Sequence, residues 1–184
     1  MILYRCFAWH ARARPADADG PLWFPRQFQG DGRHDNPAVY GCLYLSVPPV
    51  SCIVEQFARF RGQRLTAALL RRRGLPLALA ALGLDDDAVL IDLDDPAVLR
   101  RERLRPSNVA TRERAITQAQ AQKLHERHAD AAGLRWWSTH EGLWINVTLF
   151  HRAARQLRLQ EVQILTLEDS RLLEAVQFLG FQVR

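Results

Sequence analysis

The sequence has few cysteines and no long apolar run. Its three cysteines, Cys6, Cys42 and Cys52, are an odd number at unrelated spacings. Such a set matches neither a disulfide framework nor a zinc site, so we expect reduced thiols in the core. A membrane span needs about 18 apolar residues in a row, and the N-terminal MILYRCFAWHARAR also lacks a small-residue cleavage site. We therefore expect a cytoplasmic protein without a membrane partner.

Several nucleotide-binding and metal-binding motifs are also missing. There is no glycine-rich dinucleotide fingerprint and no phosphate loop, which disfavours a Rossmann dehydrogenase or a P-loop kinase. The aspartates of residues 85–95 lack the glycine and terminal glutamate of a calcium loop. His125 and His128 share a helix face but have no third ligand at a suitable spacing, so we expect a solvated helix surface and no metal.

The basic residues are almost all arginine. Lysine and arginine number 25 against 20 acidic residues, which gives a formal charge of +5, and Lys123 is the only lysine. Arginine forks suit phosphate or carboxylate, so this charge allows a phosphate-bearing ligand, a nucleic acid or an acidic partner without selecting one. A chain of 184 residues with 48% apolar content predicts one globular domain over residues 1–184.

Hydrophobic periodicity and turn residues predict strands and helices that alternate along the chain. The predicted strands are residues 2–7, 40–45, 63–70, 88–93, 134–138, 144–150, 162–167 and 181–183. The predicted helices are residues 50–60, 96–103, 151–157 and 169–179, with a long helix that Thr111 or Thr117 caps and Gly133 ends. Residues 75–84 fit either a helix or a buried strand, and residues 11–37 form a long irregular loop. Mixed strand and helix order predicts an α+β fold.

One stretch of the chain combines residues of three different chemical types. Arg33, Tyr44 and Glu55 follow one another at equal intervals of eleven residues, across a predicted loop, strand and helix. An arginine fork can grip a pyrophosphate, and a tyrosine ring can stack on a flat heterocycle. A carboxylate beside a ribose can stabilise the positive charge that develops when a glycosidic bond breaks. With Ser138 as a hydroxyl donor, these groups suit cleavage of the nicotinamide–ribose bond of NAD.

The same four residues also have ordinary structural interpretations. Glu55 can be a solvated helix residue, because it lies opposite an apolar stripe at helical spacing. Tyr44 can be a core aromatic residue, Arg33 a surface turn residue and Ser138 a hydroxyl at a strand end. Spacing alone does not choose between these interpretations and a substrate site.

The chain resembles the RES-domain family, which is named for an arginine, a glutamate and a serine. The matching segments are LYR at residues 3–5, GRHDNP at residues 32–37, YGCLYLS at residues 40–46, VSCIVEQF at residues 50–57, GLRWWS at residues 133–138 and NVTLF at residues 146–150. They follow the order of the family and span about four-fifths of the chain. The resemblance implies a split mixed β-sheet flanked by helices, related in fold to ADP-ribosyltransferases.

The resemblance also implies residue roles and a biological context. It places the arginine, glutamate and serine of the family at Arg33, Glu55 and Ser138. Arg5 and Arg33 would bind phosphates, Tyr44 would stack, Glu55 would face the ribose and its developing charge, and Ser138 would orient the substrate. NAD would be the substrate, because family members are toxins that degrade NAD or transfer ADP-ribose to a protein. The partner would be a separately encoded antitoxin with a helix-turn-helix DNA-binding domain.

The sequence departs from the family pattern in three places. His34 stands where an aromatic residue usually follows Gly-Arg, and Trp137 where many members have proline before the serine. The segment between Glu55 and Ser138 is also long. Two alternatives remain open: an arginine-rich nucleic-acid-binding module, in which Trp136 and Trp137 stack on bases, and an inactive binding module. At least one of these tryptophans should be in the core, since adjacent strand residues point to opposite faces.

Overall fold

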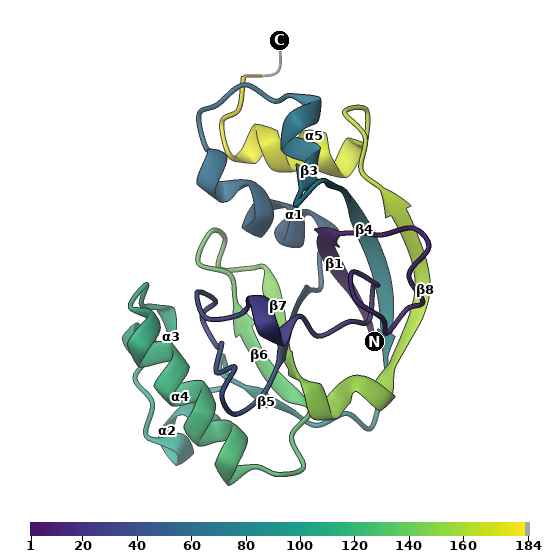
Figure 1. The fold of residues 1–184 in the computed structure, drawn as a ribbon. Helices are drawn as coiled ribbons and strands as arrows, with labels where there is room; N and C mark the ends of the chain where they lie inside the picture. The colour runs from purple at the N-terminus through teal and green to yellow at the C-terminus, as the bar shows by residue number, and fades with distance from the viewer. Residues whose placement is uncertain (183–184) are drawn as a thin grey trace. The chain divides into compact units, whose positions relative to one another are not determined.

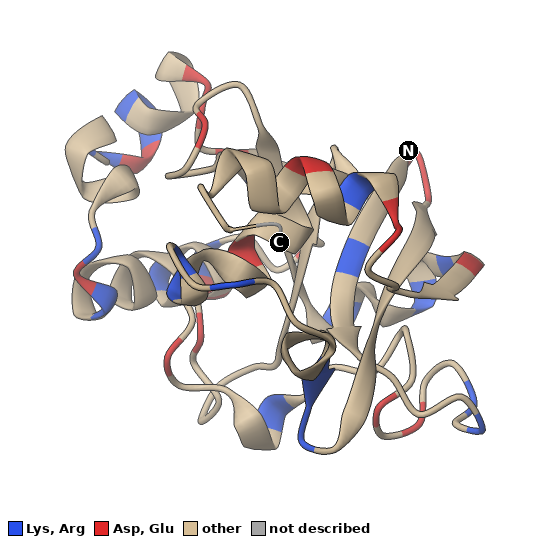
Figure 2. Cartoon of the chain, turned by 90° about the horizontal axis from the view of Figure 1, so that it is seen from above, with Lys and Arg blue, Asp and Glu red and all other residues tan. Residues whose placement is uncertain are grey.

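The computed structural model describes residues 1–182, which form two compact units. Unit 1 comprises Met1–Trp23, Leu45–Leu84 and Leu157–Arg184, and unit 2 comprises Phe24–Tyr44 and Asp85–Gln156. The described chain contains eight strands with both parallel and antiparallel pairing. This mixed pairing confirms the prediction of an α+β fold with a mixed sheet. Basic and acidic residues lie on helices, strands and loops alike (Figure 2).

Unit 1 is built around the strand β4. Its elements are β1 (Ile2–Ala8), α1 (Pro49–Phe57), the 3-10 helices η2 (Ala58–Phe60) and η3 (Ala67–Leu70), β3 (Arg71–Arg72), β4 (Leu75–Leu84), β8 (Leu157–Ile164) and α5 (Ser170–Phe178). β4 pairs antiparallel with β1, β3 and β8, and α1 packs against β1 and α5 (Figure 1). Most β4 side chains are buried, and this is why an apolar run such as LPLALAALGL shows no strand alternation.

Unit 2 contains the parallel strand pair and most of the long connections. Its elements are η1 (Arg26–Phe28), β5 (Leu90–Asp92), α2 (Pro96–Glu102), α3 (Pro106–Ala110), α4 (Arg114–Arg127), β6 (Gly133–Trp137), β7 (Ile145–Phe150) and η4 (His151–Gln156). β6 pairs parallel with β5 and antiparallel with β7. The strand β2 (Cys42–Ser46) begins in unit 2 and ends in unit 1. The core of unit 2 includes Tyr40, Leu134, Trp136 and Phe150.

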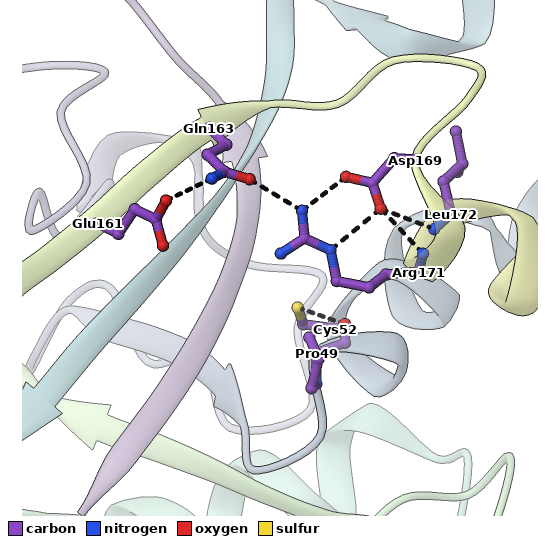
Figure 3. Close-up of polar contacts among 7 residues, drawn as sticks. All are labelled: Pro49, Cys52, Glu161, Gln163, Asp169, Arg171 and Leu172. Carbon is purple, nitrogen blue, oxygen red and sulfur yellow. Dashed lines mark hydrogen bonds and ion pairs between the residues drawn. The ribbon is translucent and has the colours of Figure 1, made fainter.

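A side-chain network fixes the start of α5 in unit 1. Asp169 caps the helix by accepting hydrogen bonds from the backbone N–H groups of Arg171 and Leu172. The same carboxylate forms a two-point ion pair with the Arg171 guanidinium, whose Nη2 also donates to Gln163 of β8 at 3.1 Å (Figure 3). These charge-assisted bonds hold the pKa of Asp169 below its ordinary value. The network therefore connects α5 to β8, which precedes it in the chain.

Two strand predictions are wrong in position or type. Residues 63–70 are not a strand but a turn followed by η3, where two alanines of low strand propensity lie in a 3-10 helix. The last long strand is β8 at Leu157–Ile164 rather than residues 162–167, because pairing with β4 from Leu84↔Leu157 to Ala78↔Ile164 determines where it lies. The predicted strand 181–183 extends beyond the described residues, within which Gln182 forms a single parallel bridge with Arg64.

The long helix α4 is shorter than predicted and has a different start. Neither Thr111 nor Thr117 caps it, since the N-cap residue is Glu113 and has no side-chain cap. The Thr111 hydroxyl accepts a hydrogen bond from the Glu113 N–H in the turn before the helix, at 3.2 Å. The segment before α4 forms the short helix α3, which the sequence did not predict. The helix predicted at residues 151–157 is the 3-10 helix η4.

The end of α4 depends on an arginine that is distant in the sequence. Arg152 donates hydrogen bonds of 2.7–3.0 Å to the carbonyl oxygens of His125, His128 and Ala129. These carbonyls have no partner inside the helix, so the guanidinium acts as its C-cap. Gly133 does not end the helix but opens β6, where a Cβ atom would lie 2.2 Å from the Thr148 carbonyl oxygen. Glycine is needed there for the close approach of two strands.

The cysteine prediction is confirmed, and the histidine prediction is wrong for one residue. Cys6, Cys42 and Cys52 are buried free thiols, and burial raises the pKa of Cys6 to about 12. His125 is only partly exposed, since its ring packs 4.3 Å from the Tyr40 ring and 4.8 Å from the Phe150 ring. Both of its ring nitrogens are buried without a hydrogen-bond partner among the described residues. His128 instead contacts Glu102, with 3.1 Å between Nε2 and Oε1.

We expect His125→Phe to stabilise the protein by about 1 kcal/mol, because it removes two unsatisfied buried nitrogens and keeps a ring in the aromatic cluster. Burial also lowers the pKa of His125 to about 4, below the value of about 6.5 expected in the unfolded chain. Between these pH values the unfolded state takes up a proton that the folded state does not, so stability falls as the pH falls. Urea unfolding from pH 7 to pH 4 should therefore show a weaker pH dependence in the variant. The exposed His10→Phe serves as the control, and an equal gain there would contradict this explanation.

None of the helices in residues 1–182 is long and apolar enough to cross a bilayer. Over the same residues, no group of three or more histidine, cysteine, aspartate or glutamate side chains is arranged to hold a metal ion.

Candidate functional site

The five predicted site residues divide between the two units. Arg5 and Glu55 belong to unit 1, and Arg33, Tyr44 and Ser138 belong to unit 2. The three in unit 2 come from a loop, the strand β2 and the residue after β6.

Arg5 in unit 1 is buried on β1 and anchors a loop. Its Nη1 atom donates to the carbonyl oxygens of Gly20 and Pro21 at 3.1 and 2.6 Å, and its guanidinium lies 4.5 Å from the centre of the Phe7 ring. Burial lowers the pKa of Arg5 to about 9, and the nearby Asp19 carboxylate opposes this shift. Part of its hydrogen-bonding capacity thus holds the long loop that follows β1.

Glu55 in unit 1 is exposed on α1, as its helical spacing predicts. Val50, Ile53, Val54 and Phe57 are buried on the opposite side of the helix. Pro49 occupies the first helical turn, where its missing N–H and fixed φ angle are compatible with a helix start. The amphipathic pattern of this helix therefore keeps the carboxylate on its accessible side.

Arg33 in unit 2 is buried and held from two directions. Its Nη1 atom donates to the carbonyl oxygens of Val109 and Thr111, at 2.7 and 3.0 Å. Its guanidinium plane also lies over the Trp136 ring, 5.0 Å from the ring centre, in a cation–π contact. The alternative interpretation of Arg33 as a surface turn residue is therefore wrong, because its side chain is buried and hydrogen-bonded.

Tyr44 is hydrogen-bonded to the two residues that follow Arg33 in the chain. The Tyr44 hydroxyl accepts a hydrogen bond from the His34 N–H at 2.9 Å and donates one to Asp35 Oδ1 at 2.7 Å. The other oxygen of Asp35 accepts from the N–H groups of Gly30 and Gly32, at 2.9 and 2.7 Å. One buried carboxylate therefore holds both the tyrosine and the loop that carries the arginine.

His34 fills the position where the family usually has an aromatic residue, and it makes aromatic contacts. Its ring stacks on the Tyr44 ring at 6.4 Å and meets the Trp136 ring edge-on at 5.3 Å. Its Nδ1 atom lies 2.9 Å from the Thr148 hydroxyl, which also accepts a hydrogen bond from the Trp136 indole N–H. Burial and the charge of Arg33 keep the pKa of His34 well below its ordinary value, so the ring is neutral.

Ser138 follows β6 directly and is 2% exposed. Its hydroxyl accepts a hydrogen bond from the His140 N–H at 3.1 Å, and its own N–H donates to the Trp144 carbonyl. Strand alternation places Ser138 on the same face as Trp136, the residue that contacts Arg33. Trp136 is the buried core tryptophan, which confirms that prediction and leaves its ring occupied by protein contacts.

Four side chains of unit 2 form one continuous row of three rings and a guanidinium. The rings of Tyr44, His34 and Trp136 and the guanidinium of Arg33 contact each other in this order. Such a row supplies a cation for an anionic group and an aromatic ring for a flat one. Because Tyr44 and His34 are neutral and hydrogen-bonded, this part of the site suits binding more than proton transfer.

The sequence alone indicated no role for Asp35 or Thr148, although both lie inside the family segments. Asp35 stands in GRHDNP and Thr148 in NVTLF. A carboxylate one residue before an Asn-Pro turn has the appearance of an ordinary turn residue. No local sequence pattern predicts the contact of Asp35 with Tyr44 or that of Thr148 with Trp136.

We expect Asp35→Asn to lower the free energy of unfolding by about 1–3 kcal/mol, because an amide NH₂ would replace an acceptor that binds two N–H groups. Tyr44→Phe should cost less in the Asp35→Asn background than in the unaltered protein, since the two residues share a hydrogen bond. Urea unfolding of the four proteins measures this coupling. Asp31→Asn, an exposed change in the same loop, is the control. Equal losses from Asp31→Asn and Asp35→Asn, or additive losses in the cycle, would contradict the assigned role.

Comparison with known proteins places the chain in a family. No curated protein matches the sequence. In the crystal structure of the M. tuberculosis MbcT-MbcA toxin-antitoxin complex, a chain with 19% sequence identity superposes with a TM-score of 0.63, over 97% of this chain and 88% of its own length. That likeness shows a common fold. The sequence also matches the RES domain over residues 2–172, and so this chain belongs to the RES-domain family.

Proposed function

We propose that the protein is an NAD-consuming toxin of a bacterial toxin–antitoxin pair, which cleaves the nicotinamide–ribose bond of NAD. Membership of the RES-domain family supports this class of function. The observation that carries it is the row of Arg33, Trp136, His34 and Tyr44, which holds a cation beside aromatic rings. A dinucleotide combines a pyrophosphate with flat rings and matches this row chemically.

In this proposal each site residue has one task. Arg33 and Arg5 bind phosphate groups, Tyr44 stacks on a ring of the substrate, and Ser138 orients it by a hydrogen bond. Glu55 stabilises the positive charge that grows on the ribose as the bond to nicotinamide breaks. The nicotinamide ring is positively charged in NAD and keeps the electron pair of the broken bond, so it departs as a neutral molecule. The step therefore requires no proton for the leaving group.

The acceptor of the ADP-ribosyl group determines the product. Water gives ADP-ribose, phosphate gives its phosphorylated form, and a protein side chain gives a modified protein. Incubation of the purified protein with NAD, followed by chromatography of the nucleotides, separates the first two. Intact mass spectrometry of added cell protein detects the third. Release of nicotinamide supports the proposed reaction class, and a lack of release with all three acceptors present would contradict it.

We further propose that a separately encoded antitoxin with a helix-turn-helix DNA-binding domain neutralises the protein in the cytoplasm. The structural neighbour was crystallised as a toxin–antitoxin complex, and this supports a protein partner of that kind. Expression in a bacterial host tests the proposal. We expect growth arrest that the gene next to this one relieves, and unchanged growth would contradict a toxic activity.

A further inference from the structure

The excess positive charge of the protein is concentrated in one segment of unit 1. Residues 55–74 contain six of the 25 basic residues and only one of the 20 acidic residues. Their net charge of +5 equals that of the whole protein, so the rest of the chain is electrically balanced. The single acidic residue in this segment is Glu55. The formal charge of +5 therefore comes from this segment and not from the chain as a whole.

The structure gathers several of these arginines at one place. We call Arg59, Arg71, Arg72 and Arg73 the arginine surface. Arg72 on β3 donates a 3.2 Å hydrogen bond to the side chain of Gln56, the residue after Glu55. Burial lowers the pKa of Arg72, and the neighbouring charges of Arg59 and Arg73 lower it further. Like charges thus lie close enough to repel each other beside the helix that carries Glu55.

Most of this positive charge is not neutralised within the protein. Arg73 pairs with Asp19. Arg71 donates to the Gly74 carbonyl at 2.6 Å, and the Arg59 guanidinium lies 4.9 Å from the centre of the Phe60 ring. Over residues 1–182 no carboxylate forms an ion pair with Arg59, Arg71 or Arg72, and all three are exposed. A bound anion would relieve their repulsion.

We propose that the arginine surface binds an acidic segment of a partner protein next to Glu55. Planar guanidinium forks match carboxylates with two parallel hydrogen bonds each. Nucleic-acid binding would benefit from exposed aromatic rings, but Phe57 is buried and Arg59 covers Phe60.

An acidic segment bound to the arginine surface would affect access to Glu55. Arg59 lies in η2, directly after α1 and four residues after Glu55, and Gln56 of α1 accepts a hydrogen bond from Arg72. An acidic segment bound there lies beside the carboxylate and hinders access to it. This consequence rests on the proposed function, in which Glu55 acts on NAD, whereas binding itself does not.

The experiment compares two charge-reversal variants of the full chain. Arg59→Glu with Arg72→Glu alters the arginine surface, and Arg12→Glu with Arg100→Glu makes the same charge change at exposed arginines elsewhere. Fluorescence anisotropy measures binding of a labelled oligoglutamate and of an oligothymidylate with equal formal charge. We expect the first variant to bind oligoglutamate about tenfold more weakly or worse, and the control to change much less. Thermal melting verifies folding, and Arg72→Gln replaces the double variant if that variant does not fold.

Three results would overturn the proposal. Equal losses in both variants would mean that only the net charge matters. Tighter binding of oligothymidylate than of oligoglutamate would indicate a nucleic-acid surface. A rise in the KM for NAD as large as the loss of peptide affinity would indicate a subsite for the phosphates of the substrate. Oligoglutamate should also inhibit nicotinamide release; if the unaltered protein releases none, the proposed function fails, and the binding measurements alone still decide this proposal.

Discussion

Glu55→Gln should lower the turnover number for nicotinamide release by about 10²–10³-fold and leave the KM for NAD nearly unchanged. The substitution keeps the size and shape of the side chain but removes the charge that the proposed mechanism needs in the transition state. Because Glu55 lies on the exposed side of α1, opposite a buried apolar stripe, the variant should fold normally. Initial rates of nicotinamide release at several NAD concentrations give the two constants.

Glu174→Gln is the matched control for this prediction. Glu174 is an exposed glutamate on α5, a helix of the same unit, so its substitution makes the same change in charge. We expect it to retain full turnover. If Glu55→Gln also retained full turnover, Glu55 would have no part in the chemistry; if it raised KM alone, its role would be substrate binding.

Arg33→Lys should weaken NAD binding by about 10–100-fold, although the charge is retained. Lysine lacks the planar guanidinium whose carbon lies over the Trp136 ring, and it cannot donate in a fixed fork to a phosphate. Loss of a charge-assisted hydrogen bond costs about 1.5–3 kcal/mol, which corresponds to this range of affinity. Isothermal titration calorimetry with NAD, at a temperature where melting shows the variant to be folded, measures the effect.

Arg114→Lys provides the control because Arg114 contacts the same loop from the surface. Its Nε atom donates to the Asp31 carbonyl oxygen at 3.1 Å, and its side chain is exposed. We expect NAD affinity within about twofold of the unaltered protein, as for most surface substitutions. Equal losses in the two variants would show that loop stability, rather than the Arg33 fork, controls binding.

The candidate site could be predicted from the sequence only in part. The helical spacing of Val50, Ile53, Val54 and Phe57 is enough to place Glu55 on the accessible side of its helix. The contact of Arg33 with Val109 joins residues 76 positions apart, and that of His34 with Thr148 joins residues 114 apart. No periodic pattern contains information of this kind. The role of Asp35 therefore becomes visible only when the loop and β2 are folded together.

The sequence by itself determined the features that depend on near neighbours. These are the alternation of strands and helices and the caps of α2 and α5 by Asp95 and Asp169. Local hydrogen bonds and side-chain periodicity control such features, and both are present in any short stretch of chain.

Only the tertiary structure decided where several elements end and what their side chains contact. Pairing with β4 positions β8, Arg152 binds the carbonyl oxygens at the end of α4, and the rings of Tyr40 and Phe150 pack on His125. In each case the deciding partner is distant in the sequence. Its contribution exists only after the chain has folded, because hydrogen bonds and packing act over a few ångströms and not along the chain.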